Sequence, residues 1–168
     1  MGNEQLLTVS DKQLIDRKVI QCIELANQFF GKNFSMPTVK LNQRGRAAGT
    51  AYLQRNEIRL NLYMYQQNPK KFIDTVIPHE VAHLLVFHLY GSKVRPHGRE
   101  WQNIMSNLYD LTPDRTHDFT PKPPSQLFEY QCSCQKHTLS IRRHNKVKQG
   151  AQYFCRNCKA ILELMNPC

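Results

Sequence analysis

Three histidines and one glutamate stand in the run VIPHEVAHLLVFH, at residues 76–88. His79 and His83 are four residues apart, so on a helix they share one face, where two imidazoles can bind one zinc ion. Glu80 is displaced from that pair and is placed to take a proton from a zinc-bound water. His88 lies five residues beyond His83, which is ~500° around a helix and far from the face that holds the pair, so we expect it to be a structural or surface histidine.

A catalytic zinc ion needs a third protein ligand and an open fourth position. His97 is the best candidate, because it follows His83 by 14 residues, beyond a tight turn at Gly91. Glu100 is the alternative ligand. These residues predict a metallopeptidase that hydrolyses peptide bonds with Glu80 as general base. The other hypothesis is a non-catalytic zinc-stabilised module that binds nucleic acid or protein, but such a site has no use for a carboxylate beside its ligands.

Four cysteines form two pairs near the end of the chain, Cys132-x-Cys134 and Cys155-x-x-Cys158. In a chain without secretory features, such a cluster indicates a metal site rather than disulfides, and we expect one structural zinc ion. Only one residue separates the first pair. His137 is therefore an alternative ligand, since its spacing from Cys134 is the usual one.

Basic residues concentrate in the same part of the chain. The 168 residues have a formal charge of +10, and residues 120–168 hold eight Lys or Arg against two Glu. Residues 137–154 alternate like a β-hairpin with its turn at Gln149-Gly150, and basic side chains crowd it. This pattern predicts DNA or RNA binding, whereas a solvated basic face or an acidic protein partner fits the same residues. The candidates are Arg142, Arg143, Lys146 and Lys148.

The elements around these residues can be predicted from their periods. Residues 11–30 carry one apolar stripe of helical period that includes Cys22, which we expect in the core, and Gly31 can end the helix. Residues 38–62 alternate apolar and polar side chains and predict two or three short antiparallel strands. An edge of that sheet could pair with a substrate strand.

The HEVAH motif is expected on a helix over residues 69–90, which has favourable capping residues at both ends. Pro78 lies inside this helix and removes one backbone donor, so we expect a kink just before His79. Residues 98–110 predict another amphipathic helix.

The stretch TPDRTHDFTPKPPS is rich in proline and polar residues and reads as a linker. It predicts a first domain over residues 1–120 and a small second domain over residues 121–168. The first residues, MGNEQLLTVSDK, lack the pattern of a signal peptide, and no run is apolar enough to span a membrane. We therefore expect a cytoplasmic protein with no membrane partner.

The segments IPHEVAHLLVFHLYG and PHGREW resemble the SprT family, whose eukaryotic relative is the Spartan protease. QRGRAAGTAYLQRNEIRLN, DRTHDF and YQCSCQKHTLSIRRHNKVKQGAQYFCRNC extend the resemblance over roughly residues 35–165. It implies an α+β fold, with a zincin-like metallopeptidase domain followed by a β-rich zinc ribbon. The family's zinc ligands fall on His79, His83 and His97, and its general base on Glu80.

Spartan-type relatives cleave proteins crosslinked to DNA. That substrate is not carried over to this chain, because the DNA-binding parts of Spartan lie outside the shared segments. The residue that would stabilise the oxyanion is not fixed by the motifs, and His117 or a tyrosine is the candidate.

Overall fold

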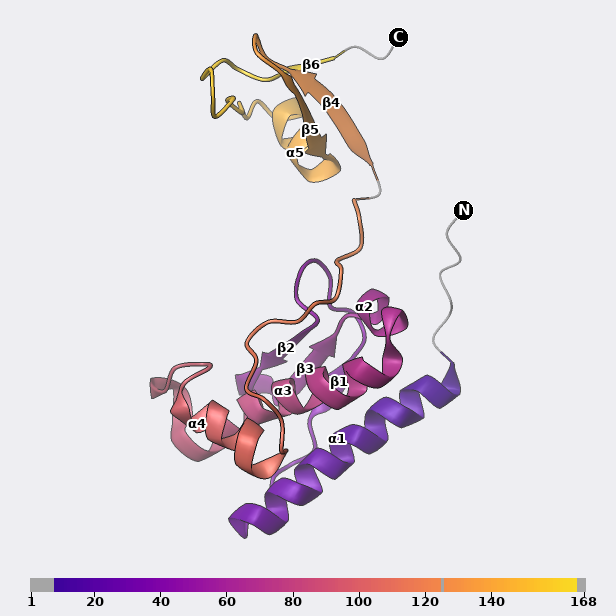
Figure 1. Cartoon of the computed structure of the whole chain (residues 1–168), viewed down its shortest axis with the longest axis vertical. Coiled ribbons are helices and arrows are strands. Elements are labelled where there is room, and N and C mark those ends of the chain that lie inside the picture. The colour runs from indigo at the N-terminus through magenta and orange to yellow at the C-terminus, as the bar shows by residue number, and fades with distance from the viewer. Residues whose placement is uncertain (1–7, 125, 166–168) are drawn as a thin grey trace. The chain divides into compact units, whose positions relative to one another are not determined.

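The computed structural model describes residues 8–124 and 126–165, and the chain divides into two compact units, Met1–Lys122 and Pro123–Cys168. Unit 1 contains the long helices and one three-stranded sheet, and unit 2 contains a second three-stranded sheet and a short helix (Figure 1). Cys168 lies outside the described residues. Among the described residues, no helix is long and apolar enough to cross a membrane.

Helix α1 (Val9–Phe30) confirms the first predicted helix. The Thr8 hydroxyl accepts a hydrogen bond from the Asp11 N–H, and the Asp11 carboxylate accepts one from the Thr8 N–H, which is a capping box. Gly31 ends the helix with φ 60°, a conformation that glycine adopts without strain. The apolar stripe of α1 faces the core, and Cys22 is 1% exposed.

The sheet of unit 1 has the order β1-β3-β2, from strands β1 (Thr38–Lys40), β2 (Gly49–Tyr52) and β3 (Glu57–Leu60). β2 and β3 are antiparallel, as predicted, but β1 runs parallel to β3. The prediction of a wholly antiparallel sheet was therefore wrong. The chain reverses once between β1 and β2 and again through the turn η1 (Leu53–Arg55), so β1 and β3 point the same way.

The HEVAH motif lies on helix α3 (Pro69–Tyr90), which confirms the predicted helix. The Asn68 side chain caps its start by accepting from the Lys71 N–H at 3.1 Å. The helix continues through Pro78. α3 packs against α1 and against β2, so ten of its 22 residues are buried (Figure 1).

Short elements complete unit 1. The predicted helix over residues 98–110 is made of two pieces, an α-helical turn and a π-helical turn, and its apolar side holds Trp101, Ile104 and Met105 in the core. The remaining elements are α2 (Leu62–Gln67), η2 (Gly91–Lys93), α4 (Arg99–Asn103) and the π-helical turn η3 (Ile104–Leu108).

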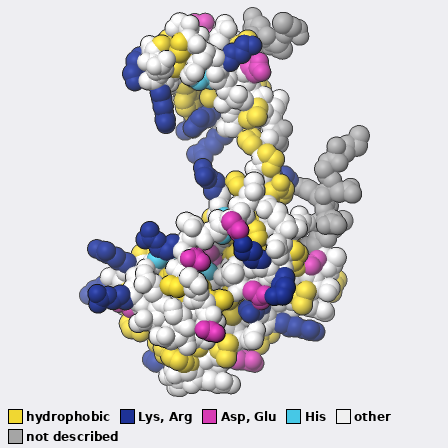
Figure 2. Space-filling view, viewed as in Figure 1, with side chains coloured by type: hydrophobic (Ala, Val, Ile, Leu, Met, Phe, Trp, Pro, Cys, Tyr) yellow, Lys and Arg dark blue, Asp and Glu magenta, His cyan; other side chains and the backbone are white. Residues whose placement is uncertain are grey.

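Unit 2 has a sheet of order β5-β4-β6 and one helix. Its small core consists of Tyr130, Leu139, Cys155 and Leu162. Lys and Arg side chains stand out from its surface (Figure 2). The elements are β4 (Leu127–Gln131), β5 (Lys136–Ser140), α5 (Ile141–Lys148) and β6 (Glu163–Leu164).

The predicted hairpin over residues 137–154 was wrong, because α5 occupies its centre. Strand alternation ends at Ser140. Beyond it Ile141, His144 and Val147 recur every three residues and turn inward, while the basic residues between them are exposed. Lys and Arg are good helix formers, and Gly150 (φ 95°) follows the end of the helix. Residues 141–148 therefore follow their helical period and not the short alternating pattern.

Candidate metal centres

The structure brings His79, His83 and His97 together. One ligand nitrogen from each lies within 4.8 Å of the others, and Nε2 of His79 is 3.2 Å from Nε2 of His97. His79 and His83 come from one face of α3, and His97 comes from the turn that precedes α4. The chain reversal at Gly91 (φ 74°) returns the backbone to the helix so that this third ring can join the pair.

The surroundings of the three imidazoles favour the neutral form, which a metal requires. Burial, and then the charge of His97, lowers the pKa of His79 to about 4. Burial, and then the charges of its two histidine neighbours, lowers the pKa of His83 to about 3. Burial and the charge of Arg115 lower the pKa of His97. Three neutral imidazoles that converge at this separation fit a zinc ion.

Trp101 supports all three rings, a role that was not predicted from the sequence. Its ring centroid lies 4.7 Å from those of His79 and His97 and 5.6 Å from that of His83. The indole Nε1–H donates to the backbone carbonyl of His79 at 3.3 Å, and the side chain is wholly buried. The signal in the sequence was its place in PHGREW, one helical turn after His97.

Backbone carbonyls hold two of the histidine rings. The Asp114 carbonyl hydrogen-bonds the His79 ring, and the Pro96 carbonyl hydrogen-bonds the His83 ring. Such contacts fix the tautomer and orientation of a metal-binding imidazole. Sequence reasoning could not find them, because every residue has a carbonyl and only the fold selects these two.

Glu80 is buried, with 6% of its surface exposed. Burial raises its pKa to about 8, and a hydrogen bond from the Ala51 backbone opposes that rise. Its side chain lies directly over Gly49 in β2, where a Cβ atom would be 2.6 Å from Glu80 Cγ. A divalent cation beside this carboxyl would favour its ionised form and offset the cost of burial.

The other candidates from the sequence lie elsewhere. His88 is exposed near the end of α3, with its ring 6.3 Å from that of Phe34. Glu100 is outside the group of three histidines, and its Oε2 lies against Gly98. Nε2 of His117 accepts a hydrogen bond from the Ala48 N–H at 3.1 Å.

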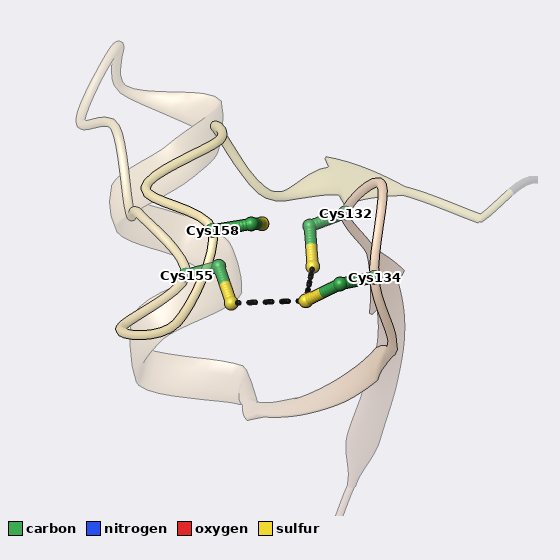
Figure 3. A group of neighbouring side chains, drawn as sticks. All are labelled: Cys132, Cys134, Cys155 and Cys158. Carbon is green, nitrogen blue, oxygen red and sulfur yellow. Dashed lines mark hydrogen bonds between the residues drawn. The ribbon is translucent and has the colours of Figure 1, made fainter.

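The four cysteines form a second group, with their sulfur atoms within 4.8 Å of one another. Cys132 and Cys134 come from the turn between β4 and β5, and Cys155 and Cys158 from the loop after α5, and their side chains converge (Figure 3). Cys132 Sγ is 3.5 Å from Cys134 Sγ, which in turn is 3.7 Å from Cys155 Sγ. His137 is outside this group, with its Nε2 3.2 Å from Cys132 Sγ.

The second cysteine pair favours thiolate, the form that binds a metal. Backbone N–H groups of Cys158 and Asn157 lower the pKa of Cys155. The Ser133 side chain and the Ala160 backbone lower the pKa of Cys158 to about 6. Backbone N–H groups of the C-x-x-C turn thus reach the sulfur atom of Cys155.

Comparisons with known proteins match the histidine group and the cysteine group to two different family models. The model of the SprT-like family matches residues 19–118, which include the three histidines and Glu80. The chain belongs to the SprT-like family. The model of the SprT-like zinc ribbon domain matches residues 126–165, which include all four clustered cysteines.

Relatives of similar length share nearly half of its residues. The chain is 49% identical to "Protein SprT" of Pasteurella multocida over 152 residues, which is 89% of this chain and 92% of the relative. It is 45% identical to "Protein SprT" of Yersinia pestis over 157 residues, 90% of this chain and 92% of the relative. No solved structure matches. The ribbon match and the cysteine group together support zinc binding by unit 2 of this SprT-like chain.

Proposed function

We propose that this SprT-like protein is a zinc-dependent metallopeptidase with a zincin-like catalytic unit. The observation that carries the proposal is the buried Glu80 carboxyl, next in the chain to His79, which converges with His83 and His97. A metal site that served the fold alone would gain nothing from an acid buried next to its ligands. That acid distinguishes the enzyme from a non-catalytic zinc-stabilised module.

Each residue then has a role. His79, His83 and His97 would hold the ion, which when bound polarises a peptide carbonyl and lowers the pKa of a water to about 7. Glu80 accepts a proton from the water and gives it to the leaving amine. The Ala51 N–H holds the carboxylate in place for both transfers.

The edge strand β2 supports a peptide as the substrate. The Ala48 carbonyl accepts from the Asn61 N–H at 2.7 Å, which directs it toward the β3 side of the sheet. Backbone groups alternate between the two sides of an antiparallel strand, so those of Gly49 and the carbonyl of Ala51 face the open edge, where the Ala51 N–H is already bonded to Glu80. An extended peptide added there would run beside Glu80.

The test is peptide cleavage by native protein and by Glu80→Gln. We expect the variant to keep its zinc and to lose at least about 100-fold in rate, because general base catalysis contributes 10²–10⁴-fold. Glu100→Gln is the matched control, since it makes the same change outside the histidine group. Cleavage that survives Glu80→Gln would refute the mechanism, and zinc lost only in Glu100→Gln would assign the third ligand to Glu100.

The basic helix α5 supports a second function, binding of single-stranded nucleic acid by unit 2. Its four Lys and Arg side chains are all exposed, and the inward face is used for packing. Arg143 lies 5.9 Å from the Tyr153 ring, so charge and an aromatic surface are close together. Proteins bind single strands with this combination. We therefore propose nucleic acid as a partner that brings the peptidase to its substrates.

This partner is tested by measuring the affinity for a labelled single-stranded oligonucleotide at several salt concentrations. The double variant Arg142→Ala with Arg143→Ala should bind more weakly and reduce the slope of log affinity against log salt by about 1.4, or ~0.7 for each phosphate contact. Arg55→Ala with Lys93→Ala removes the same charge from exposed positions of unit 1 and should leave the slope unchanged. Equal slopes for both double variants would exclude α5 as the binding surface.

A further inference from the structure

Residues 112–120, which follow η3, form a segment across unit 1 that we call the strap. Side-chain contacts fix its C-terminal end. Gln67 and Thr120 exchange two hydrogen bonds, from side-chain amide to backbone carbonyl at 2.7 Å and from backbone N–H to side-chain carbonyl at 3.0 Å. Phe119 is 8% exposed, with its ring 5.4 Å from that of Phe72 in α3. Lys71 Nζ contacts the Asp118 carboxylate at 2.6 Å. The segment read as a linker from its composition is therefore built into the core.

The other end of the strap reaches the histidine group. Nε2 of His79 points toward Nε2 of His97, which leaves Nδ1–H of His79 to donate to the Asp114 carbonyl. This hydrogen bond sets which nitrogen is free for a metal. The orientation of His79 thus depends on where the strap places the backbone of Asp114.

His117 joins the strap to the sheet between these two ends. Its Nε2 accepts from the Ala48 N–H at 3.1 Å, so Nδ1 carries the ring proton. Ala48 is buried and directly precedes Gly49, the residue packed against Glu80. One side chain therefore connects the strap that orients His79 with the strand that confines Glu80.

We infer that His117 is a positioning residue of the histidine centre, which fixes the strap so that the Asp114 carbonyl can orient His79 for zinc. This inference rests on the proposed zinc site but not on peptide cleavage. Without His117, the strap between η3 and Asp118 has no described side-chain bond to the sheet, and the Ala48 N–H loses its acceptor. His79 can then rotate away from the orientation in which it meets the other two rings.

The test is the zinc affinity of the full chain, measured by competition with a chelating dye. His117→Ala should weaken zinc binding at the histidine site about 10–100-fold, the usual effect of losing a residue that supports a metal ligand. His117→Gln should restore it, because the amide oxygen can accept from the Ala48 N–H. His88→Ala is the matched control, since it removes an exposed histidine outside the site.

Cobalt substitution separates the two metal sites, since only the cysteine site gives thiolate charge-transfer absorption. That absorption should be the same in all three variants.

Unchanged zinc affinity in His117→Ala, or a His117→Gln variant that binds zinc as weakly as His117→Ala, would overturn the inference. If His117→Ala does not fold, His117→Gln decides: native affinity supports the hydrogen bond to Ala48, and a tenfold loss refutes it. Native protein that binds zinc but cleaves no peptide would refute the proposed function and leave this result standing.

Discussion

Glu80 and Gly49 show how single residues define the chemistry of unit 1. The carboxyl is enclosed by the edge strand, and the missing side chain of Gly49 provides the space for it. The φ of Gly49 does not require glycine, so the constraint is steric. The strand can lie this close to the helix only because one residue lacks a Cβ atom.

Gly49→Ala should therefore impair the proposed peptide cleavage while the protein stays folded. The new methyl group would lie 2.6 Å from Glu80 Cγ and 2.7 Å from Oε1, so the buried carboxyl must move. A displacement of about 1 Å can cost about 100-fold in rate. Peptide cleavage measures the loss, and metal analysis should find the native amount of zinc, because the three atoms nearest to the new group belong to Glu80 and not to an imidazole.

Thr50→Ser is the control for this variant. It removes one methyl group from the opposite face of the same strand and keeps the hydroxyl that donates to the Gly49 carbonyl at 2.7 Å. We expect native activity from it. Full activity in Gly49→Ala would mean that the position of Glu80 does not limit the reaction.

At the scale of elements, the sequence predicted long periodic segments well and short ones poorly. Helices α1 and α3 have enough turns for a clear period and a cap at each end, and both were found within two residues of their predicted bounds. α5 has eight residues after a five-residue strand, and a local alternation concealed its helical period. The direction of β1 depends on two chain reversals, which no local pattern encodes.

The same contrast holds within the histidine site. The pair His79 and His83 follows from helical geometry, since both residues belong to one element. Trp101 and the Asp114 carbonyl lie on other segments, and only the tertiary fold brings them to these rings. The strap was read as a linker because proline and polar residues dominate it, although Phe119 is packed in the core.

At the scale of the whole molecule, the two units depend on metal to different degrees. Unit 1 has an extensive apolar core, with Trp101, Phe72 and Ile58 among its fully buried side chains. The core of unit 2 has four buried apolar side chains, one of them the metal-site residue Cys155. A zinc ion bound by four thiolates contributes about 10–16 kcal/mol. That is comparable to the whole stability of an ordinary domain, about 5–15 kcal/mol, so we expect unit 2 to fold only with its metal.

Cys155→Ser should therefore unfold unit 2 and spare unit 1. We expect the full chain to fall from two zinc ions to one, with amide exchange protection lost over residues 126–165 and kept in α1 and α3. His137→Ala should retain both ions, because its ring lies beside Cys132 and outside the cysteine group. If His137→Ala loses one zinc ion and Cys155→Ser keeps both, then His137 and not Cys155 is the ligand. Protection that persists over residues 126–165 after zinc is removed would show that this small core suffices to fold the ribbon, and the metal would then serve another purpose.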